Sequence, residues 1–202
     1  MSNPGDELGG RLPLAERSAM SEPQQQLYDR MTKSVVPWSE QAGFISQTND
    51  ARFIGPFNPA LQSPIICGSF LQFQAAEEEY TSLAPRVRQV VILAVGAVWH
   101  SAYELYAHSA VARTVGLPDQ VIQALADGQM PGELSAAEQV AWRFTNQLTS
   151  ERRVEQSVYD QAHAQFDAHG ITDTLCLIGA YQTVCGILNS FEIPAPETDQ
   201  AP

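Results

Sequence analysis

Basic residues are scarce in this chain. Its 202 residues include 11 Lys and Arg against 23 Asp and Glu, for a formal net charge of −12. A protein that binds nucleic acid needs a basic face to neutralise phosphates, and binding to anionic membranes needs the same. The composition therefore argues against both kinds of partner.

Cysteine is also rare, and it does not occur in pairs. The three cysteines, Cys67, Cys176 and Cys185, form no C-x-x-C motif. Thiols that are few and scattered are typical of buried free cysteines in a reducing compartment. The sequence therefore predicts a cytoplasmic protein without a disulfide framework.

Long hydrophobic runs are missing as well. The longest apolar segment, Val90–Trp99, is far too short to cross a bilayer, and the first ten residues do not resemble a signal peptide. Charged residues make up only 17% of the chain, which leaves a comparatively bare surface. We expect no membrane association, and we expect a homo-oligomer rather than a monomer.

What the chain does contain is helical periodicity, with no alternating pattern typical of strands. Caps, glycines and prolines divide it into seven expected helices: 21–35, 64–80, 86–112, 119–127, 135–148, 154–169 and 173–191. The predicted fold class is all-α. We expect a disordered N-terminus over residues 1–10, a single domain with an extended N-terminal arm over 11–196, and a tail over 197–202.

The expected long helix 86–112 carries an unusual polar stripe. Ser101, Glu104 and His108 are separated by three and four residues, which places them along one side of a helix. A carboxylate one turn before an imidazole can orient it and shift its pKa, so the stripe is a candidate acid–base site, with His108 as the proton carrier and Glu104 as its orienter or as the base itself. A plain i,i+4 pair on a half-exposed face, or a metal site that adds His100, are the alternatives. Ser101 as a nucleophile is weaker, because a hydroxyl within a helix usually bonds its own backbone.

Three further features lie outside the stripe. Arg86 and Arg88 could attract a carboxylate substrate, although arginines near a helix start are common. The rigid apolar turn Phe53–Pro59 is of the kind that packs over a core or over the mouth of a pocket. Asn189 either faces the same cavity or caps a helix end.

Several of these segments together resemble a known family. Pro85–Gln89 (PRVRQ) followed by Tyr103–His108 (YELYAH) is similar to the carboxymuconolactone decarboxylase family, which includes the alkyl hydroperoxidase D-like proteins. The resemblance extends to Phe53–Pro59 upstream and to Asn189–Pro194 near the end. It implies an alkyl hydroperoxidase D-like helical bundle that assembles into trimers or hexamers, with its pocket near a subunit interface.

The peroxidase branch of that family uses a Glu, a C-x-x-C pair and a His. The matching positions here are Gln89, Ser101, Glu104 and His108. Thiol peroxidase chemistry needs a thiolate to attack the peroxide and a second thiol to resolve the product. Neither Ser101 nor Glu104 can supply these groups.

The decarboxylase branch is closer, because a Glu–His pair in an apolar cavity can protonate the enolate left by loss of CO₂. The resemblance implies a cofactor-free enzyme, without a metal, acting on a small carboxylated or lactone metabolite. Glu104 and His108 are its expected catalytic residues. The expected substrate-binding residues are Ser101, His100, Gln89, Arg86, Phe57 and Asn189. The alternatives are a peroxidase that uses the cysteines from elsewhere in the fold, and a small-molecule-binding oligomer without turnover.

Overall fold

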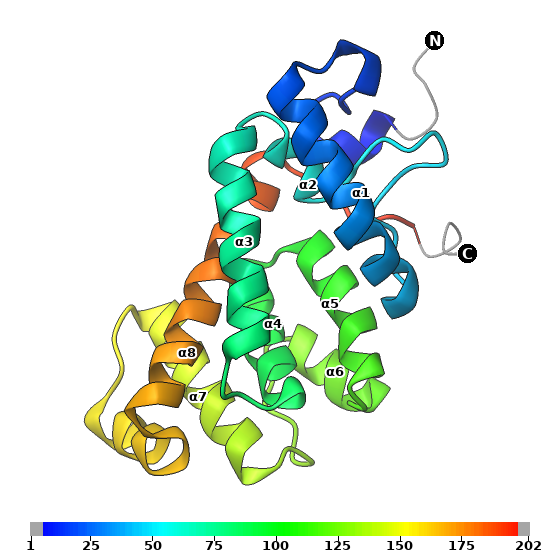
Figure 1. Cartoon of the computed structure of the whole chain (residues 1–202). Coiled ribbons are helices and arrows are strands. Elements are labelled where there is room, and N and C mark those ends of the chain that lie inside the picture. Colours follow the sequence, from blue (N-terminus) through cyan, green and yellow to red (C-terminus); the bar gives the residue numbers. More distant parts are fainter. Residues whose placement is uncertain (1–5, 198–202) are drawn as a thin grey trace.

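The computed structural model describes residues 6–197, which form an all-helical protein (Figure 1). The expected fold class is confirmed, and the only strand-like pairing among these residues is an isolated bridge between Gln47 and Phe53. Two short 3-10 helices, η1 (Asp6–Gly9) and η2 (Arg17–Ala19), precede the α-helices. These are α1 (Glu22–Ala42), α2 (Phe57–Ala60), α3 (Pro64–Tyr80), α4 (Pro85–Trp99), α5 (Ala102–Thr114), α6 (Asp119–Ala126), α7 (Ala136–Glu151) and α8 (Gln156–Ser190).

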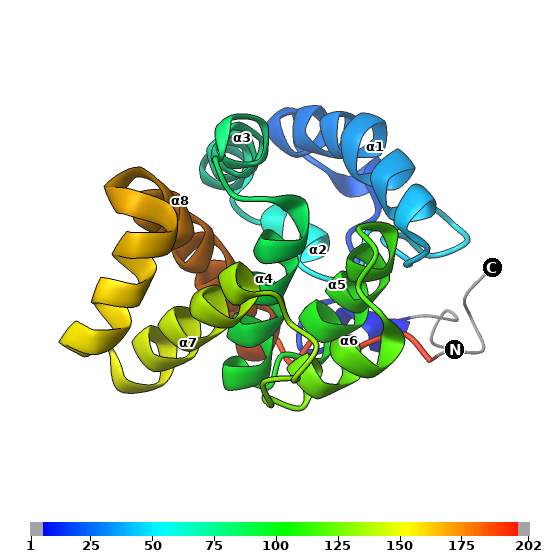
Figure 2. The ribbon, with the colours of Figure 1, turned by 90° about the horizontal axis from the view of Figure 1, so that it is seen from below.

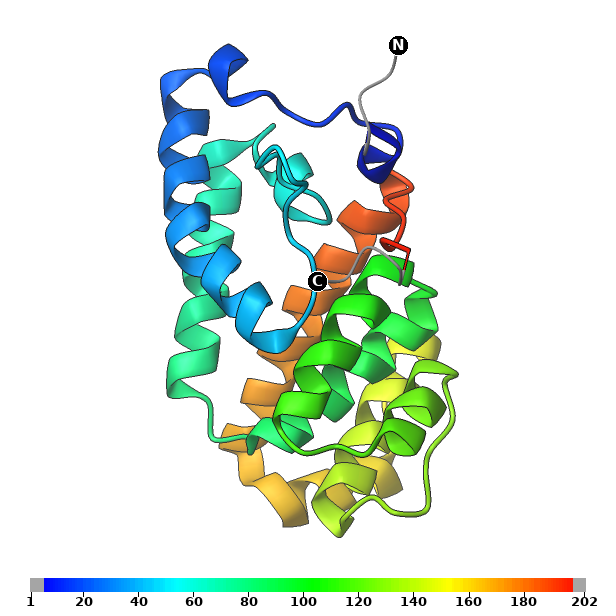
Figure 3. The ribbon, with the colours of Figure 1, turned by 90° about the vertical axis from the view of Figure 1, so that its right-hand side faces the viewer.

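Helix α4 forms the centre of the bundle. It is apolar around its whole circumference, and every residue from Gln89 to Ala97 is buried. A helix that is hydrophobic on all sides must be covered on all sides. Helices α5, α6, α7 and α8 provide that cover (Figure 2), while α1 and α3 form a separate wall on one side of the molecule (Figure 3).

The expected single helix 86–112 is wrong, because the chain turns between two helices at this point. His100 has a left-handed backbone (φ 49°) and ends α4, and Ser101 (φ −89°, ψ 100°) is the N-cap of α5. Both helices carry apolar residues at helical spacing, so the pattern runs through the break without a change of period. A left-handed residue other than glycine leaves no trace in composition.

Helix α1 is longer than expected. Its start is as the sequence predicts, with a capping box between Ser21 and Gln24, but it continues past Val35 to Ala42. Pro37 lies inside it and is exposed. Proline removes one helical hydrogen bond, and on a solvent-facing side water can serve the freed carbonyl. The loop expected over residues 37–64 is shorter for the same reason.

The break expected near Gly170 and Thr172 is displaced. The non-helical residue is Asp167 (φ 53°, ψ −170°), and its Oδ1 accepts hydrogen bonds from the backbone N–H groups of His169 and Gly170. Asp167 therefore caps the second part of α8, whereas the Thr172 hydroxyl donates to the Ala168 carbonyl. In the described residues α8 is the one helix long and apolar enough to span a bilayer, a test that buried core helices also pass.

The expected disorder of residues 1–10 is wrong where it can be compared. Residues 1–5 lie outside the described part of the chain, but Asp6–Gly9 form η1 and bury Leu8. The adjoining Arg11 donates its backbone N–H to the Phe191 carbonyl at 2.7 Å and forms an ion pair with Glu192 at 2.5 Å. The N-terminal arm is thus fastened to the end of α8. The expected tail lies outside the described residues from position 198 onward.

Helix α3 is the least covered of the long helices. Of its residues only Gly68 is buried, and Ile65, Ile66 and Tyr80 are each 72% exposed. Exposed apolar side chains at this density are typical of contact surfaces. The expected trimer or hexamer stays a prediction.

Gly55 allows the backbone to approach the ring of Tyr103 on α5 closely. It has φ +61°, and a Cβ there would lie 2.3 Å from the ring of Tyr103, whose hydroxyl donates to the Ile45 carbonyl at 2.6 Å. We expect Gly55→Ala to lower the free energy of unfolding by about 2–5 kcal/mol, combining left-handed strain with a clash. Urea unfolding would measure this loss.

Gly43 offers a matched control for that change. It is also left-handed (φ +81°), but a Cβ there would meet nothing within 4 Å. Gly43→Ala should therefore cost only the backbone strain, about 1–2 kcal/mol. Equal losses for the two variants would show that the approach to Tyr103 is not tight.

Candidate functional site

A cavity of about 300 Å³ lies between the wall formed by α1 and α3 and the helices α5 and α8. Its lining is mainly apolar and includes Val35, Trp38, Phe44, Phe57, Phe70 and Val184. A few polar side chains, from α3, α4, α5 and α8, reach the same space: Glu77, Arg88, Glu104, His108 and Tyr181. A concave apolar space with a few convergent polar groups is the usual form of a small-molecule site.

Glu104 and His108 come from α5 and lie one turn apart. Their side chains are buried, with exposed fractions of 4% and 5%, and Nε2 of His108 lies 3.4 Å from Oε1 of Glu104. The alternative of a half-exposed surface pair is therefore excluded. The structure brings together the two residues that the sequence singled out, in the wall of a cavity.

Gln89 connects this pair to the central helix. Its Oε1 lies 2.9 Å from Nδ1 of His108, and both side chains are buried. A carbonyl oxygen can only accept a hydrogen bond, so Nδ1 of His108 carries the proton and donates it. The free lone pair is then on Nε2, the nitrogen that faces Glu104.

Burial determines the charge of Glu104. Its carboxyl group is fully enclosed, and Oε1 has no hydrogen-bond partner in the described residues. An unsolvated carboxylate is costly, so burial raises the pKa of Glu104 to about 8. At neutral pH Glu104 is an uncharged acid that holds a proton.

His108 is shifted the other way. Burial lowers its pKa to about 3, and the positive charge of Arg88 adds to the effect. The ring also packs edge-on against Tyr181, with centroids 4.9 Å apart. The two pKa shifts favour Glu104 as the proton donor and His108 as the group that orients it, which reverses the roles expected from the sequence.

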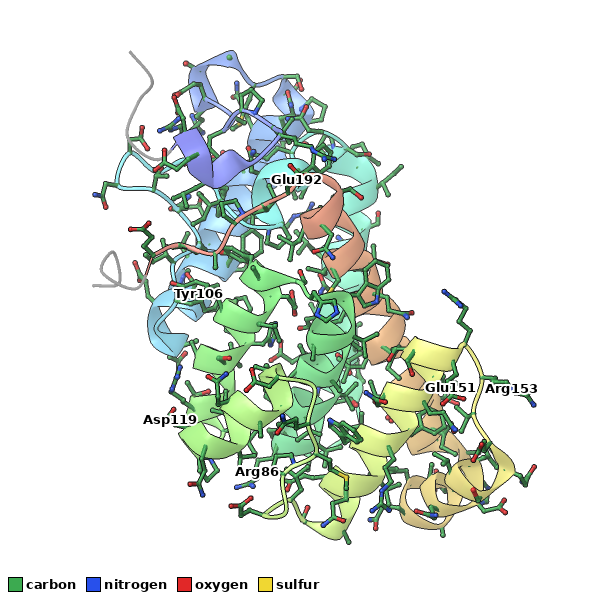
Figure 4. All side chains as sticks on the ribbon, turned by 180° about the vertical axis from the view of Figure 1, so that it is seen from behind. Arg86, Tyr106, Asp119, Glu151, Arg153 and Glu192 are labelled. Carbon is green, nitrogen blue, oxygen red and sulfur yellow. The ribbon has the colours of Figure 1, made fainter. Side chains whose placement is uncertain are left out.

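Only Phe57 of the six expected substrate-binding residues lines the cavity, and three of the others, Arg86, His100 and Asn189, have a different role or face solvent. Arg86 is paired with Glu138 at 2.7 Å, and its guanidinium also donates to the Gly116 carbonyl. It lies toward the lower end of the molecule in Figure 4, whereas Tyr106 lies higher. His100 is exposed at the turn after α4, and Asn189 donates to the Trp99 carbonyl at 2.7 Å, capping the end of that helix. Each side chain thus has a structural partner or faces solvent.

The other expected residues, Phe57, Gln89 and Ser101, lie closer to the Glu104–His108 pair. Phe57 lines the cavity, and Gln89 contacts His108 from behind. Ser101 is completely buried at the start of α5, and its hydroxyl has no hydrogen-bond partner in the described residues, but it does not line the cavity. It sits three residues before Glu104 and supports the turn that presents it.

Several side chains that line the cavity could not be identified from the sequence. The sequence pairs Arg88 only with Arg86, and it gives no reason to single out Glu77, Trp38 or Tyr181. Helical geometry separates residues 86 and 88 by about 200°, so one arginine had to face away from the other. Arg88 is the one that faces inward, because it forms an ion pair with Glu77 of α3.

The described residues do not form a site that fits either the metal alternative or the thiol alternative. No group of three or more His, Cys, Asp or Glu able to hold a metal ion occurs in the described residues, and His100 is separated from the Glu104–His108 pair by the turn. All three cysteines are free. Cys67 lines the cavity, but burial raises the pKa of its thiol, which disfavours a reactive thiolate.

Comparison with known proteins agrees with this architecture. Residues 69–147, which include α4, α5 and the Glu104–His108 pair, match the model of the carboxymuconolactone decarboxylase family. No curated protein matches the chain.

Solved structures share the fold at low identity. A peroxidase-related protein from Ralstonia eutropha JMP134, described as an alkylhydroperoxidase AhpD core, is 14% identical with a TM-score of 0.72; the match covers 97% of this chain and 95% of that one. A peroxidase-related protein from Silicibacter sp. TM1040 is 15% identical with a TM-score of 0.66, over the same shares. The debrominase Bmp8, in complex with 2,3,4-tribromopyrrole, is 11% identical with a TM-score of 0.69, covering 91% of this chain and 90% of that one.

The family model matches the part of the chain that holds the acid–base pair, and the structural matches extend over nearly its whole length. Residues 69–147 thus match the carboxymuconolactone decarboxylase family, and the chain has the alkyl hydroperoxidase D-like helical fold.

Proposed function

We propose that this protein is a cofactor-free enzyme that decarboxylates a small carboxylated or lactone metabolite, with Glu104 as the proton donor. One observation carries the proposal: the buried carboxyl group of Glu104 lines an apolar cavity beside the imidazole of His108, and this burial raises the pKa of Glu104 to about 8. A carboxyl group with a pKa near 8 holds its proton at neutral pH and can still release it to a strong carbon base.

The reaction balances without an added redox partner. The bond between the substrate carboxylate and the neighbouring carbon breaks, CO₂ leaves, and the electron pair remains on the substrate as an enolate. The enolate takes the proton of Glu104 at carbon. The Glu104 carboxylate then regains a proton from solvent, so one proton is consumed for each CO₂ released.

His108 acts as a positioning residue in this scheme. Its Nδ1–H donates to Gln89, which fixes the ring, and its Nε2 lone pair lies 3.4 Å from Glu104. The imidazole thus packs beside the carboxyl group at the cavity wall and restricts its position without a hydrogen bond to Oε1. Gln89 therefore contributes through His108 rather than by touching the substrate.

The size and lining of the cavity support a small, planar substrate. About 300 Å³ is at the lower end of the usual range for ligand sites, and six of the lining side chains are Phe, Tyr or Trp. The structurally similar debrominase was solved with a small halogenated pyrrole. A compact ring such as a lactone is of comparable size.

The test is release of CO₂ from γ-carboxymuconolactone by the wild-type protein and by His108→Ala. We expect wild-type turnover, and a loss of about 100-fold in kcat for the variant because Glu104 is no longer held in place. His163→Ala is the control, since His163 is exposed on α8 and should leave kcat unchanged.

Absence of turnover in a folded wild-type protein would overturn the lactone assignment. If ligands still stabilised the protein without product formation, the binding-protein alternative would replace it. Peroxide consumption that disappears on replacing Cys67 by serine would instead support the thiol alternative.

A further inference from the structure

An ion pair lies in the wall of the same cavity. Arg88 of α4 and Glu77 of α3 both line it, and the Arg88 guanidinium donates to both carboxylate oxygens of Glu77 through Nε and Nη2. The side chains are 12% and 5% exposed. Glu78 lies farther off, 3.9 Å from Nη1 of Arg88, and is 70% exposed.

Stability alone is a poor reason for this arrangement. Removing two charges from water is costly, and a buried ion pair often adds no more stability than apolar residues of similar volume. The walls around it are apolar, so such residues would fit the surroundings. The placement of the pair in a ligand cavity points instead to a role in binding.

Arg88 is the one side chain with a fixed positive charge among the described residues that line this cavity. A guanidinium binds a carboxylate through two parallel N–H donors, which makes arginine the preferred partner for that group. In this structure Glu77 occupies those donors. Its carboxylate is chemically the same kind of group that a carboxylated substrate would present.

Arg88 and the acid–base pair also share one space. The positive charge of Arg88 acts on His108 and on Tyr181, and all of them line the cavity with Glu104. A small molecule held at Arg88 by its carboxylate would therefore place its body against Glu104 and His108. The cavity also adjoins a second one of about 490 Å³, and Arg88, Glu78 and Trp38 lie between the two.

We propose that Arg88 anchors the carboxylate of a small monoanionic ligand, and that Glu77 holds the guanidinium in place until the ligand displaces it. Glu77 lies in the last turn of α3, next to residues that face solvent, so its carboxylate has an outward route. The exchange replaces one carboxylate by another at the same cation. Neutral ligands gain nothing from it, so the pair selects for anions.

This inference deepens the proposed function by naming the group that holds the substrate, but its test does not use turnover. Binding of benzoate and of its uncharged analogue benzamide would be measured by calorimetry for wild type and Glu77→Gln. Freeing Arg88 should make benzoate bind about tenfold more tightly in Glu77→Gln, equivalent to about 1.4 kcal/mol, and leave benzamide unchanged. Arg88→Gln should abolish the preference for benzoate over benzamide.

Glu79→Gln is the matched control, because Glu79 carries the same charge on the same helix but is exposed and does not line the cavity. It should leave both affinities unchanged. Circular dichroism would confirm that each variant is folded. If Glu77→Gln does not fold, Arg88→Lys serves instead and should weaken benzoate more than benzamide, since it keeps the charge but loses the paired donors.

Unchanged benzoate affinity in a folded Glu77→Gln variant would overturn the inference, as would an equal weakening of both ligands by Arg88→Lys. Absence of benzoate binding to both the wild-type protein and the folded Glu77→Gln variant would overturn it as well. None of these outcomes bears on whether Glu104 donates a proton. Conversely, a protein that binds benzoate as expected but releases no CO₂ would retain the anchor and lose the reaction.

Discussion

Glu104→Gln is expected to lower kcat for decarboxylation about a thousandfold, within the range of general acid catalysis. An amide has the shape of the carboxylic acid and fits the same enclosed site, but it cannot deliver a proton to carbon. Because Glu104 is already uncharged at neutral pH, the substitution removes no charge interaction from the folded protein. Steady-state rates of CO₂ release, together with thermal unfolding, would measure both properties.

The control for this change is Glu40→Gln, at an exposed position on α1 outside the cavity lining. It should leave both kcat and the unfolding temperature at wild-type values. A Glu104→Gln variant with more than about a tenth of wild-type kcat would contradict the assignment of Glu104 as the acid, because the chemical step would then not depend on its proton. Lost activity with lost folding would point to a structural role instead.

The pH dependence of activity and of stability gives the second large effect. Glu104 has a pKa of about 8, so the active acid form is present below that pH and disappears above it. We expect kcat to fall about tenfold for each pH unit above 8, as for any single essential proton. A pH profile of CO₂ release would show it, and a profile flat to about pH 10 would contradict it.

The free energy of unfolding should also fall as the pH rises. The folded pKa of Glu104 lies above its ordinary value of 4.5, so its contribution is fully present below pH 4.5 and is lost as pH rises through 8. The total loss is about 5 kcal/mol of unfolding free energy, at roughly 1.4 kcal/mol for each pH unit between the two pKa values. Urea unfolding at about pH 5 and about pH 9 should show about 4 kcal/mol of this loss in wild type and none of it in Glu104→Gln.

The contribution of His108 to stability changes at low pH, so it does not affect the comparison of wild type with Glu104→Gln. Its pKa is lowered from 6.5 to about 3, so its contribution is present above pH 6.5 and is lost as pH falls toward 3. Both proteins retain His108. Subtracting the two unfolding free energies at each pH therefore isolates the Glu104 part.

The acid–base pair could be predicted from sequence because it depends only on local geometry. Residues four apart on a helix meet whatever the rest of the fold does, so the spacing of Glu104 and His108 is enough to find them. The N-caps Ser21 and Ser135 are local in the same way, since each forms a capping box with the residue three positions later.

The parts that could not be predicted depend on distant contacts. The turn at His100 leaves the apolar pattern intact on both sides, so nothing in the sequence marks it. Asn189 reaches a carbonyl 90 residues away. The inward position of Arg88 follows from its pairing with α3, and a helical wheel cannot show where another helix will pack.

The turn between α4 and α5 has a consequence for how chemistry can diverge on this scaffold. It makes Ser101 the cap and puts Glu104 in the first turn of α5, at the positions where the resemblance places the thiol pair of the peroxidase branch. The positive end of a helix dipole lies there, which favours a thiolate and equally favours a carboxylate. In this chain desolvation overrides that preference and keeps Glu104 protonated. The same helix terminus can thus present an anionic nucleophile or a neutral acid, and the depth of enclosure decides between them.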